Sequence, residues 1–387
     1  MEQIYLIITI SAIIMFSPMI ATIIKTPAVV VEIFLGMFAG YFGLIFHYEI
    51  LTLLAELGLL YLMFLAGLEV NLKLANIVKK DLAVNVSLYF AFLYGLAAII
   101  CITLDLSILY LLALPIFSLG MLMVLIKEYG KEEKWLNIAL AVGVVGEVLS
   151  ILGLTIFSGW LEYGFGFDFL ISVITLFSVL VATLLILKLF RIIVWWHPQL
   201  RDYIIPKENR LDQDIRFAFA LFFILIALMI YLKIDVVLGA FIAGLFLKIF
   251  FHTQEELFEK LSSIGFGFFI PIFFIYTGST VDINMITKDI FYNAVYIVAG
   301  IVFVRLVASF ATFYNYLQWR ENLLFALSAS IPLTFLVAIS MIAFQHKLIS
   351  QDEYYAFILA SMIDGLVLLI VIRNMYNWLG FHKHKHG

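Results

Sequence analysis

Long apolar stretches follow one another along nearly the whole chain and limit its fold more than any other feature. Most are close to the roughly 20 residues that an α-helix needs to cross about 30 Å of hydrocarbon. Thirteen can be marked, at residues 4–24, 27–46, 51–70, 82–103, 106–126, 136–159, 167–190, 214–233, 234–251, 261–281, 289–315, 321–344 and 353–379. Because 65% of the residues are hydrophobic and only 13% charged, the sequence predicts one all-α polytopic membrane domain over residues 1–387, with about 13 transmembrane helices and no separate soluble domain.

The basic residues indicate how these helices cross the membrane. An odd number of spans places the two ends of the chain on opposite sides. If the N-terminus is outside, only Lys233, Lys288 and Lys347 of the 23 lysines and arginines fall outside, and Arg305 lies within a span. Since cytoplasmic segments carry the excess of Lys and Arg, we predict a multi-pass protein of the plasma (inner) membrane with its N-terminus outside and its C-terminus cytoplasmic. The N-terminal stretch lacks a basic leader and a cleavage site, so we expect a retained first span.

The fifth and the twelfth apolar stretches each contain a proline together with small residues. Stretch 106–126 contains Pro115, Ser118 and Gly120, and stretch 321–344 contains Ser328, Ser330 and Pro332. Proline removes a backbone donor and clashes with the preceding helical turn. Broken helices at corresponding places in two halves of a transporter point to its midplane site. The pattern therefore predicts an inverted-repeat transporter, with Ser118, Gly120, Ser328 and Ser330 lining the site.

Glu147 lies near the centre of stretch 136–159. A carboxylate at that depth costs about 2.5–3.5 kcal/mol or more, so such residues are usually functional. This group can hold a proton or a bare monovalent cation, but not both at once, which is the physical basis of an exchanger. Asp364 has the same depth in the last stretch, which corresponds to the Glu147 stretch in the other half.

Arg305 is the third ionisable residue well inside a span. Its guanidinium cannot lose its proton, so it needs a carboxylate, carbonyls or water. One interpretation is a static buried ion pair; the other is that Glu147 titrates in a water-filled cavity beside Arg305. Asp364 is either a second titrating group or the counter-charge of Arg305, and the counter-charge is preferred. Glu32 and Glu69, nearer the cytoplasmic side, either take part in transport, are solvated at helix ends or form a cytoplasmic ion pair.

The sequence also excludes several classes of function. The single cysteine, Cys101, rules out an internal disulfide and a cysteine metal cluster. The histidines are scattered over separate loops and the tail, so we predict no metal site. No phosphate-binding loop, metalloprotease motif or nucleophile motif is present, so we expect neither an enzyme nor a cofactor. A net charge of −4 gives no indication of nucleic-acid binding.

Several motifs resemble one family of transporters. The segments LAELGLL at 54–60 and FLAGLE at 64–69 resemble its third-span signature, and three more segments match, at 29–40, 238–247 and 269–282. Over nearly its whole length the chain resembles the membrane domain of the monovalent cation:proton antiporters, in the Kef and NapA-like branch of the sodium/hydrogen exchanger superfamily.

This resemblance implies a homodimer of 13-span chains, each with a dimerisation part and a mobile core part in which the two broken helices cross. The family's paired polar motif falls on Gly146 and Glu147, its basic residue on Arg305, and its Ser-Thr on Ser118 and Leu119. Gly146 and Leu119 lack the family's polar side chains, and Glu147 replaces an aspartate. The ion would therefore depend more on carbonyls and water. Unlike in the long Kef proteins, we expect no nucleotide-binding regulatory domain after Gly387.

The predicted function is antiport of protons against Na⁺ or K⁺, with Glu147 as the shared site and Arg305 as its buried basic partner. One carboxylate indicates one-for-one, electroneutral exchange, and a second carried charge would require Asp364 to titrate. The alternatives are a sodium-coupled organic-anion symporter, in which half-helix N-termini and Arg305 bind the anion, a divergent non-exchanging sensor, or a channel.

Overall fold

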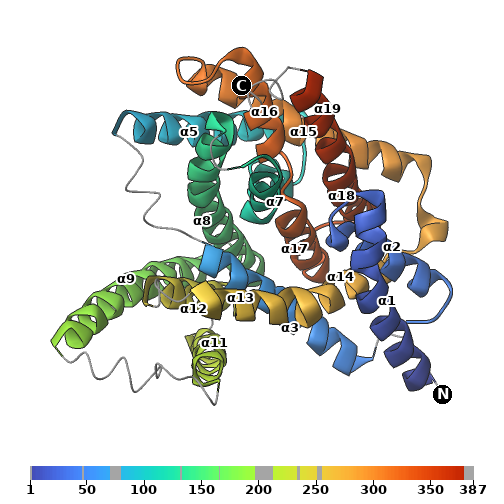
Figure 1. The fold of residues 1–387 in the computed structure, drawn as a ribbon, viewed down its shortest axis with the longest axis horizontal. Coiled ribbons are helices and arrows are strands. Elements are labelled where there is room, and N and C mark those ends of the chain that lie inside the picture. The colour runs from blue at the N-terminus through green and yellow to red at the C-terminus, as the bar shows by residue number, and fades with distance from the viewer. Residues whose placement is uncertain are drawn as a thin grey trace. The chain divides into compact units, whose positions relative to one another are not determined.

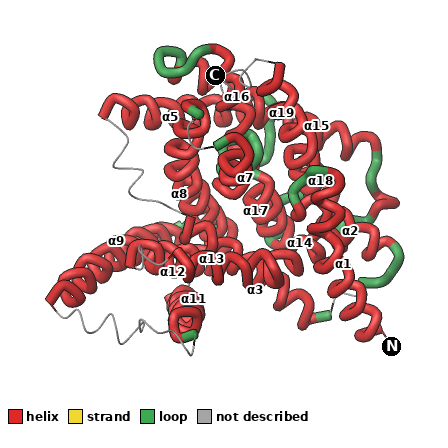
Figure 2. The backbone as a smooth tube through the Cα atoms, viewed as in Figure 1, coloured by secondary structure: helices red, strands yellow, loops and turns green. Residues whose placement is uncertain are grey.

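Helices make up all the regular structure in the described part of the chain. A computed structural model describes residues 2–45, 48–69, 80–130, 133–164, 166–196, 212–232, 236–250 and 255–378. Within these ranges the chain forms helices and loops without a β-strand (Figure 2). The fold class predicted from the apolar stretches is therefore confirmed.

Each of the thirteen apolar stretches coincides with helix (Figure 1). The α-helices are α1 (Glu2–Ile24), α2 (Ala28–Tyr41), α3 (Glu49–Glu69), α5 (Lys80–Thr103), α6 (Ile108–Ala113), α7 (Leu119–Tyr129), α8 (Lys134–Tyr163), α9 (Phe167–Trp196), α11 (Gln213–Leu232), α12 (Val236–Phe250), α13 (Glu255–Ile264), α14 (Ile270–Ser279), α15 (Lys288–Phe313), α16 (Trp319–Ala329), α17 (Leu333–Gln345), α18 (Gln351–Ile363) and α19 (Leu369–Trp378). Short π-helical turns η1 (Gly265–Phe269) and η3 (Asp364–Leu368) and a 3₁₀ turn η2 (Ile283–Met285) complete the set. In the described chain nine helical stretches are long and apolar enough to cross a membrane. Helices α2, α9 and α12 and the broken pair α6 and α7 correspond to the remaining predicted spans.

The stretches that contain Pro115 and Pro332 are both broken where the sequence predicts. Helix α6 ends at Ala113 and α7 begins at Leu119, with Pro115 in the interruption. Helix α16 ends at Ala329 and α17 begins at Leu333, directly after Pro332. Helix α7 packs on α16, and α6 packs on α17. Each half of one broken helix is therefore in contact with a half of the other, as expected where two broken helices cross.

The chain divides into two compact units. One comprises Met1–Tyr48, Lys73–Ser150 and Phe274–Gly387, and the other Glu49–Leu72 and Ile151–Phe273. Both broken helices, Arg305 and Asp364 belong to the first unit, together with Glu147 on the first half of α8.

Close helix contact through glycine organises the second unit, in which α3 packs against α12. A Cβ atom at Gly67 would collide with the Phe241 carbonyl, and one at Gly244 with the Phe64 carbonyl. Small residues let membrane helices approach to backbone contact, where dispersion and close packing replace the hydrophobic effect. The two glycines thus permit this helix pair to form.

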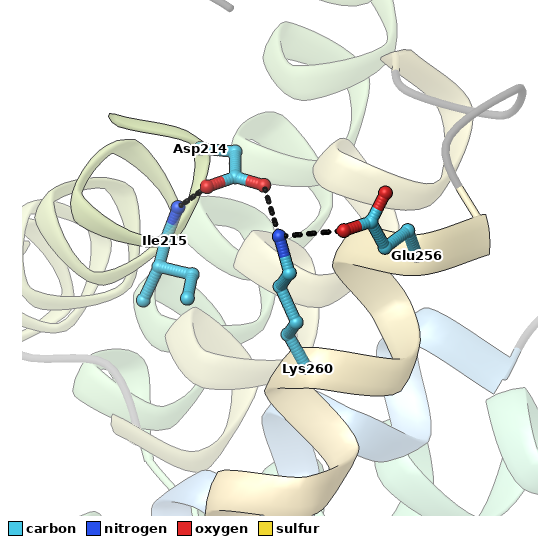
Figure 3. A network of polar contacts seen from close by, with 4 residues as sticks. All are labelled: Asp214, Ile215, Glu256 and Lys260. Carbon is cyan, nitrogen blue, oxygen red and sulfur yellow. Dashed lines mark hydrogen bonds and ion pairs between the residues drawn. The ribbon is translucent and has the colours of Figure 1, made fainter. Parts of the chain in front are cut away.

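An ionic contact joins α11 to α13 in the same unit (Figure 3). The Lys260 ammonium lies 3.8 Å from the Asp214 carboxylate and 2.9 Å from that of Glu256. Asp214 also accepts a hydrogen bond of 2.8 Å from the Ile215 amide. Because Asp214 is nearly buried, the lysine offsets a charge that would otherwise be costly.

In the first unit, α15 is the central packing element. It contacts α5, α16 and α18. Ile301, Val304, Arg305 and Ala308 are buried at a spacing of three and four residues, which defines one face of the helix. Arg305 is therefore directed into the protein and away from lipid.

Candidate functional site

The interruption between α6 and α7 lies inside the protein. Leu114, Ile116, Phe117 and Ser118 are all buried. Non-helical backbone at membrane depth is tolerated only where other groups satisfy its polar atoms. The side chains that do so form the candidate site.

Arg305 satisfies the carbonyl side of the interruption. Its Nη1 donates to the Leu114 carbonyl and, at 3.3 Å, to the Ile301 carbonyl of its own helix, while Nη2 donates to the Ile116 carbonyl. The guanidinium carbon also lies 5.1 Å from the centre of the Phe117 ring, within the range of a cation–π interaction. Arg305 is fully buried, so these contacts replace water around a permanent charge.

Glu147 satisfies the amide side of the same interruption. Its Oε2 accepts a hydrogen bond of 3.1 Å from the Leu119 amide, the first residue of α7. The first amides of a helix have no partner within the helix, and they give its N-terminus a partial positive charge that favours a carboxylate. Glu147 is 2% exposed, so its side chain faces the protein interior. This is the residue at which the sequence predicts the shared proton and cation site.

Two hydroxyl side chains that were not predicted from the sequence, those of Ser150 and Thr334, also bond to residues of the interruption. The Ser150 hydroxyl accepts from the Phe117 amide at 2.8 Å and donates to the Gly146 carbonyl at 2.7 Å. The hydroxyls of Ser118 and Thr334 lie 2.9 Å apart and share a hydrogen bond, which links the first broken helix to the start of α17. The sequence indicates these two residues only weakly, since Ser150 lies one helical turn after Glu147 and Thr334 lies just after Pro332.

The other predicted lining residues have different surroundings. Ser328 donates to the Phe325 carbonyl at 2.8 Å and Ser330 to the Ala326 carbonyl at 2.7 Å. Both hydroxyls are thus directed at the backbone of their own helix near its end. Gly120 lies in the first turn of α7. The structure brings Ser118 to the second broken helix, while its role and those of the other lining residues stay predictions.

Asp364 is fully buried and begins the π-helical turn η3. Neither of its carboxylate oxygens accepts a hydrogen bond from the described residues. The preferred prediction made Asp364 the counter-charge of Arg305, but the guanidinium hydrogen-bonds to carbonyls at the end of α6 and not to this carboxylate. Arg305 and Asp364 therefore form no direct hydrogen bond with each other in this structure.

Glu32 and Glu69 belong to different units. Glu32 is buried on α2 and accepts a hydrogen bond of 3.3 Å from the Ser17 hydroxyl of α1. Glu69 is the half-buried last residue of α3. Glu32 therefore has an interhelical partner, and a transport role for either acid stays a prediction.

Phe117 occupies the space beside the predicted paired motif. A Cβ atom at Gly146 would lie 2.6 Å from Cγ of the Phe117 ring, closer than real side-chain atoms approach. The ring therefore fills the place in which a polar side chain at position 146 would begin. Because the ring leaves no room for a side chain at position 146, Glu147 is the single carboxylate of the motif.

Residues 8–378 match the family described as "Sodium/hydrogen exchanger, transmembrane". A Bacillus subtilis protein named "Putative Na(+)/H(+) antiporter YjbQ" is 26% identical over 383 residues, which cover 91% of this chain and 59% of that protein. The Synechocystis protein "Na(+)/H(+) antiporter NhaS4" is 28% identical over 264 residues, or 62% of this chain and 60% of the relative. The matches thus span about three fifths of the length of these relatives.

Solved structures share the fold. The sodium proton antiporter MjNhaP1 of Methanocaldococcus jannaschii at pH 8 aligns over 98% of both chains with a TM-score of 0.69 and 18% identity. An electron-microscopy structure of the same antiporter gives 0.71 and 17%. At this identity the likeness concerns the fold alone. None of these proteins carries a Kef or NapA name, so that branch stays a prediction.

Proposed function

Because this chain belongs to the sodium/hydrogen exchanger family, we propose that it is a secondary active antiporter that exchanges protons for Na⁺ or K⁺. The family consists of secondary transporters and not of enzymes, as the sequence predicted, and the described chain contains many membrane-spanning helices. The relatives named as Na⁺/H⁺ antiporters favour Na⁺ as the first cation to test.

The observation that carries the proposal is the position of Glu147. The carboxylate is buried in the first unit and bonded to the first amide of α7, beside the interruption of a broken helix. Hard cations are bound by oxygen atoms. Glu147 would supply the charged oxygen, while the hydroxyls of Ser118 and Thr334 and nearby carbonyls would supply neutral ones. A proton and a cation then compete for the same carboxylate.

Exchange also requires that the site opens to the two sides of the membrane in turn. Glu147 is only 2% exposed, so its carboxylate would have to become accessible for an ion to bind or leave. Rocking of the part that holds the two broken helices would expose the carboxylate alternately. One carboxylate carries one charge in each direction, so the exchange would be electroneutral unless Asp364 also titrates.

Three further features belong to this proposal. We expect a homodimer, a division into a dimerisation part and a mobile core part, and a plasma-membrane orientation with the N-terminus outside. They are supported by the family assignment and by the distribution of basic residues in the sequence.

The test is a proton-flux assay on the protein reconstituted in vesicles, with internal pH followed after addition of Li⁺, Na⁺, K⁺ or Rb⁺. We expect cation-driven proton flux that is lost in Glu147→Gln, because the amide can neither release a proton nor balance a cation. The rate should not change when the membrane potential is clamped.

The matched control is Asp214→Asn, the same change from carboxylate to amide at a buried acid of the second unit, and it should retain exchange. Exchange that survives Glu147→Gln would overturn the assignment of the carboxylate. Uptake of an organic anion without proton counterflow would favour the symporter, and no flux with any cation would favour the sensor.

A further inference from the structure

A cavity of about 380 Å³ lies between the turn that joins α1 to α2 and the helices α7 and α19. All four elements belong to the first unit. The polar residues that line the cavity are Thr22, Lys25, Thr26 and Arg373, and its apolar lining includes Val124 and Leu369. Among the residues that the structure describes, none that lines the cavity is acidic.

Two cations from distant parts of the chain meet at this cavity. Lys25 follows α1, and Arg373 lies on α19 and donates from Nη1 to the Lys25 carbonyl at 3.0 Å. This bond holds the turn against α19 and keeps both cations at the same cavity. A guanidinium has five N–H donors, so Arg373 can bind this carbonyl and an anion together.

A hydroxyl at the cavity lacks a partner. Thr26 Oγ1 is buried and forms no hydrogen bond with any of the residues that the structure describes. In contrast, the Thr22 hydroxyl donates to the Pro18 carbonyl of its own helix at 2.8 Å. A buried hydroxyl without a partner is costly, and Thr26 could donate to an anionic oxygen bound beside it.

The helices around the cavity carry apolar outer faces. Only 11% of the apolar window of α1 is buried within the protein, and Met19, Ile23 and Ile24 are exposed close to the cavity in sequence. On α19 and the turn before it, Ile370 and Val367 are exposed as well. In a chain that spans the membrane these side chains contact lipid, so the cavity adjoins a surface along which acyl chains lie.

We propose that this cavity binds the phosphate headgroup of an anionic phospholipid. Lys25 and Arg373 would pair with the phosphate oxygens, since charge-assisted bonds from guanidinium to phosphate are strong and directional. Thr26 would donate a neutral hydrogen bond, and Val124 and Leu369 would contact the glycerol and upper acyl carbons. The apolar lining and the lipid-facing neighbours favour a lipid over a soluble phosphate. The inference depends on membrane insertion and not on the transport reaction.

The experiment measures binding of dioleoyl-phosphatidylglycerol to the full-length protein in detergent by native mass spectrometry. Dioleoyl-phosphatidylcholine and inorganic phosphate are titrated in parallel. Each basic residue near a membrane surface is worth about a fivefold change in affinity for an anionic lipid. We therefore expect about fivefold weaker binding in Lys25→Gln and in Arg373→Gln, and about 25-fold in the double variant.

Further variants separate binding from folding. Arg320→Gln removes a basic residue that does not line the cavity and should bind the lipid as the unchanged protein does. Arg373→Lys and Thr26→Val preserve charge and volume respectively, so both should fold, and both should weaken binding less than the double variant. The proposal is overturned if the double variant binds phosphatidylglycerol normally or if phosphatidylcholine binds equally well. Inorganic phosphate binding with the affinity of the lipid would overturn the lipid assignment.

Discussion

Arg305 and Glu147 bind opposite sides of the same interruption in a helix. The arginine donates to the carbonyls of Leu114 and Ile116, and the glutamate accepts from the amide of Leu119. Leaving a buried polar group without its partner costs about 1–3 kcal/mol. At the scale of single residues, these two charges therefore stabilise the non-helical backbone of the interruption.

Phe117 and Gly146 depend on each other at the same scale. We predict that Gly146→Ala destabilises the protein by about 1–3 kcal/mol, because the added methyl group overpacks against the Phe117 ring. Phe117→Leu should make room for the added methyl group. The double variant should therefore lose less stability than the sum of the losses in the two single variants. The measurement is thermal unfolding of the purified protein in detergent.

The control for this pair is Gly95→Ala. A Cβ atom at Gly95 meets open space, and alanine is the better helix former, so this variant should be unchanged or more stable. Strictly additive effects of Gly146→Ala and Phe117→Leu would contradict the packing argument.

At the scale of elements, the broken helix α6–α7 is held to α8 by Ser150 as well as by Glu147. We predict that Ser150→Ala lowers stability by about 1–3 kcal/mol, since the buried Phe117 amide loses its acceptor. The melting midpoint in detergent should fall accordingly.

Thr155 provides a matched control on the same helix. Its hydroxyl donates only to the Ile151 carbonyl one turn back at 2.9 Å, a bond whose loss leaves no backbone amide without a partner. Thr155→Ala should therefore change the midpoint little. Equal effects of the two substitutions would mean that Ser150 contributes packing alone.

At the scale of the whole molecule, the distribution of basic residues predicts the orientation in the membrane. Cys101 is the single cysteine, so Cys101→Ala gives a background for labelling. Asn284 and Asn315 are exposed at the two ends of α15, the helix that carries Arg305.

In intact cells a membrane-impermeant maleimide should react with Asn284→Cys from outside. It should react with Asn315→Cys only after the membrane is opened, because the predicted topology places that turn in the cytoplasm. The reverse pattern of labelling would show that the chain is inserted the other way round.

Much of the architecture could be predicted because its causes act over short distances in the chain. Hydropathy over about 20 residues determines whether a segment can cross a bilayer, and the thirteen stretches all coincide with helix. Proline disturbs the helical turn that precedes it, which predicted the breaks near Pro115 and Pro332, whereas α1 accommodates Pro18 without a break. The depth of Glu147 within its span follows directly from counting residues.

The partners of these residues were decided by the tertiary structure. Arg305 binds carbonyls 189 and 191 positions away, Thr334 meets Ser118 across 216 positions, and Phe117 fills the space at Gly146. No local pattern encodes such pairs, because they depend on which helices pack together and at what rotation. The sequence by itself therefore determined the spans, the breaks and the depth of the carboxylate, whereas packing decided which groups satisfy the broken backbone.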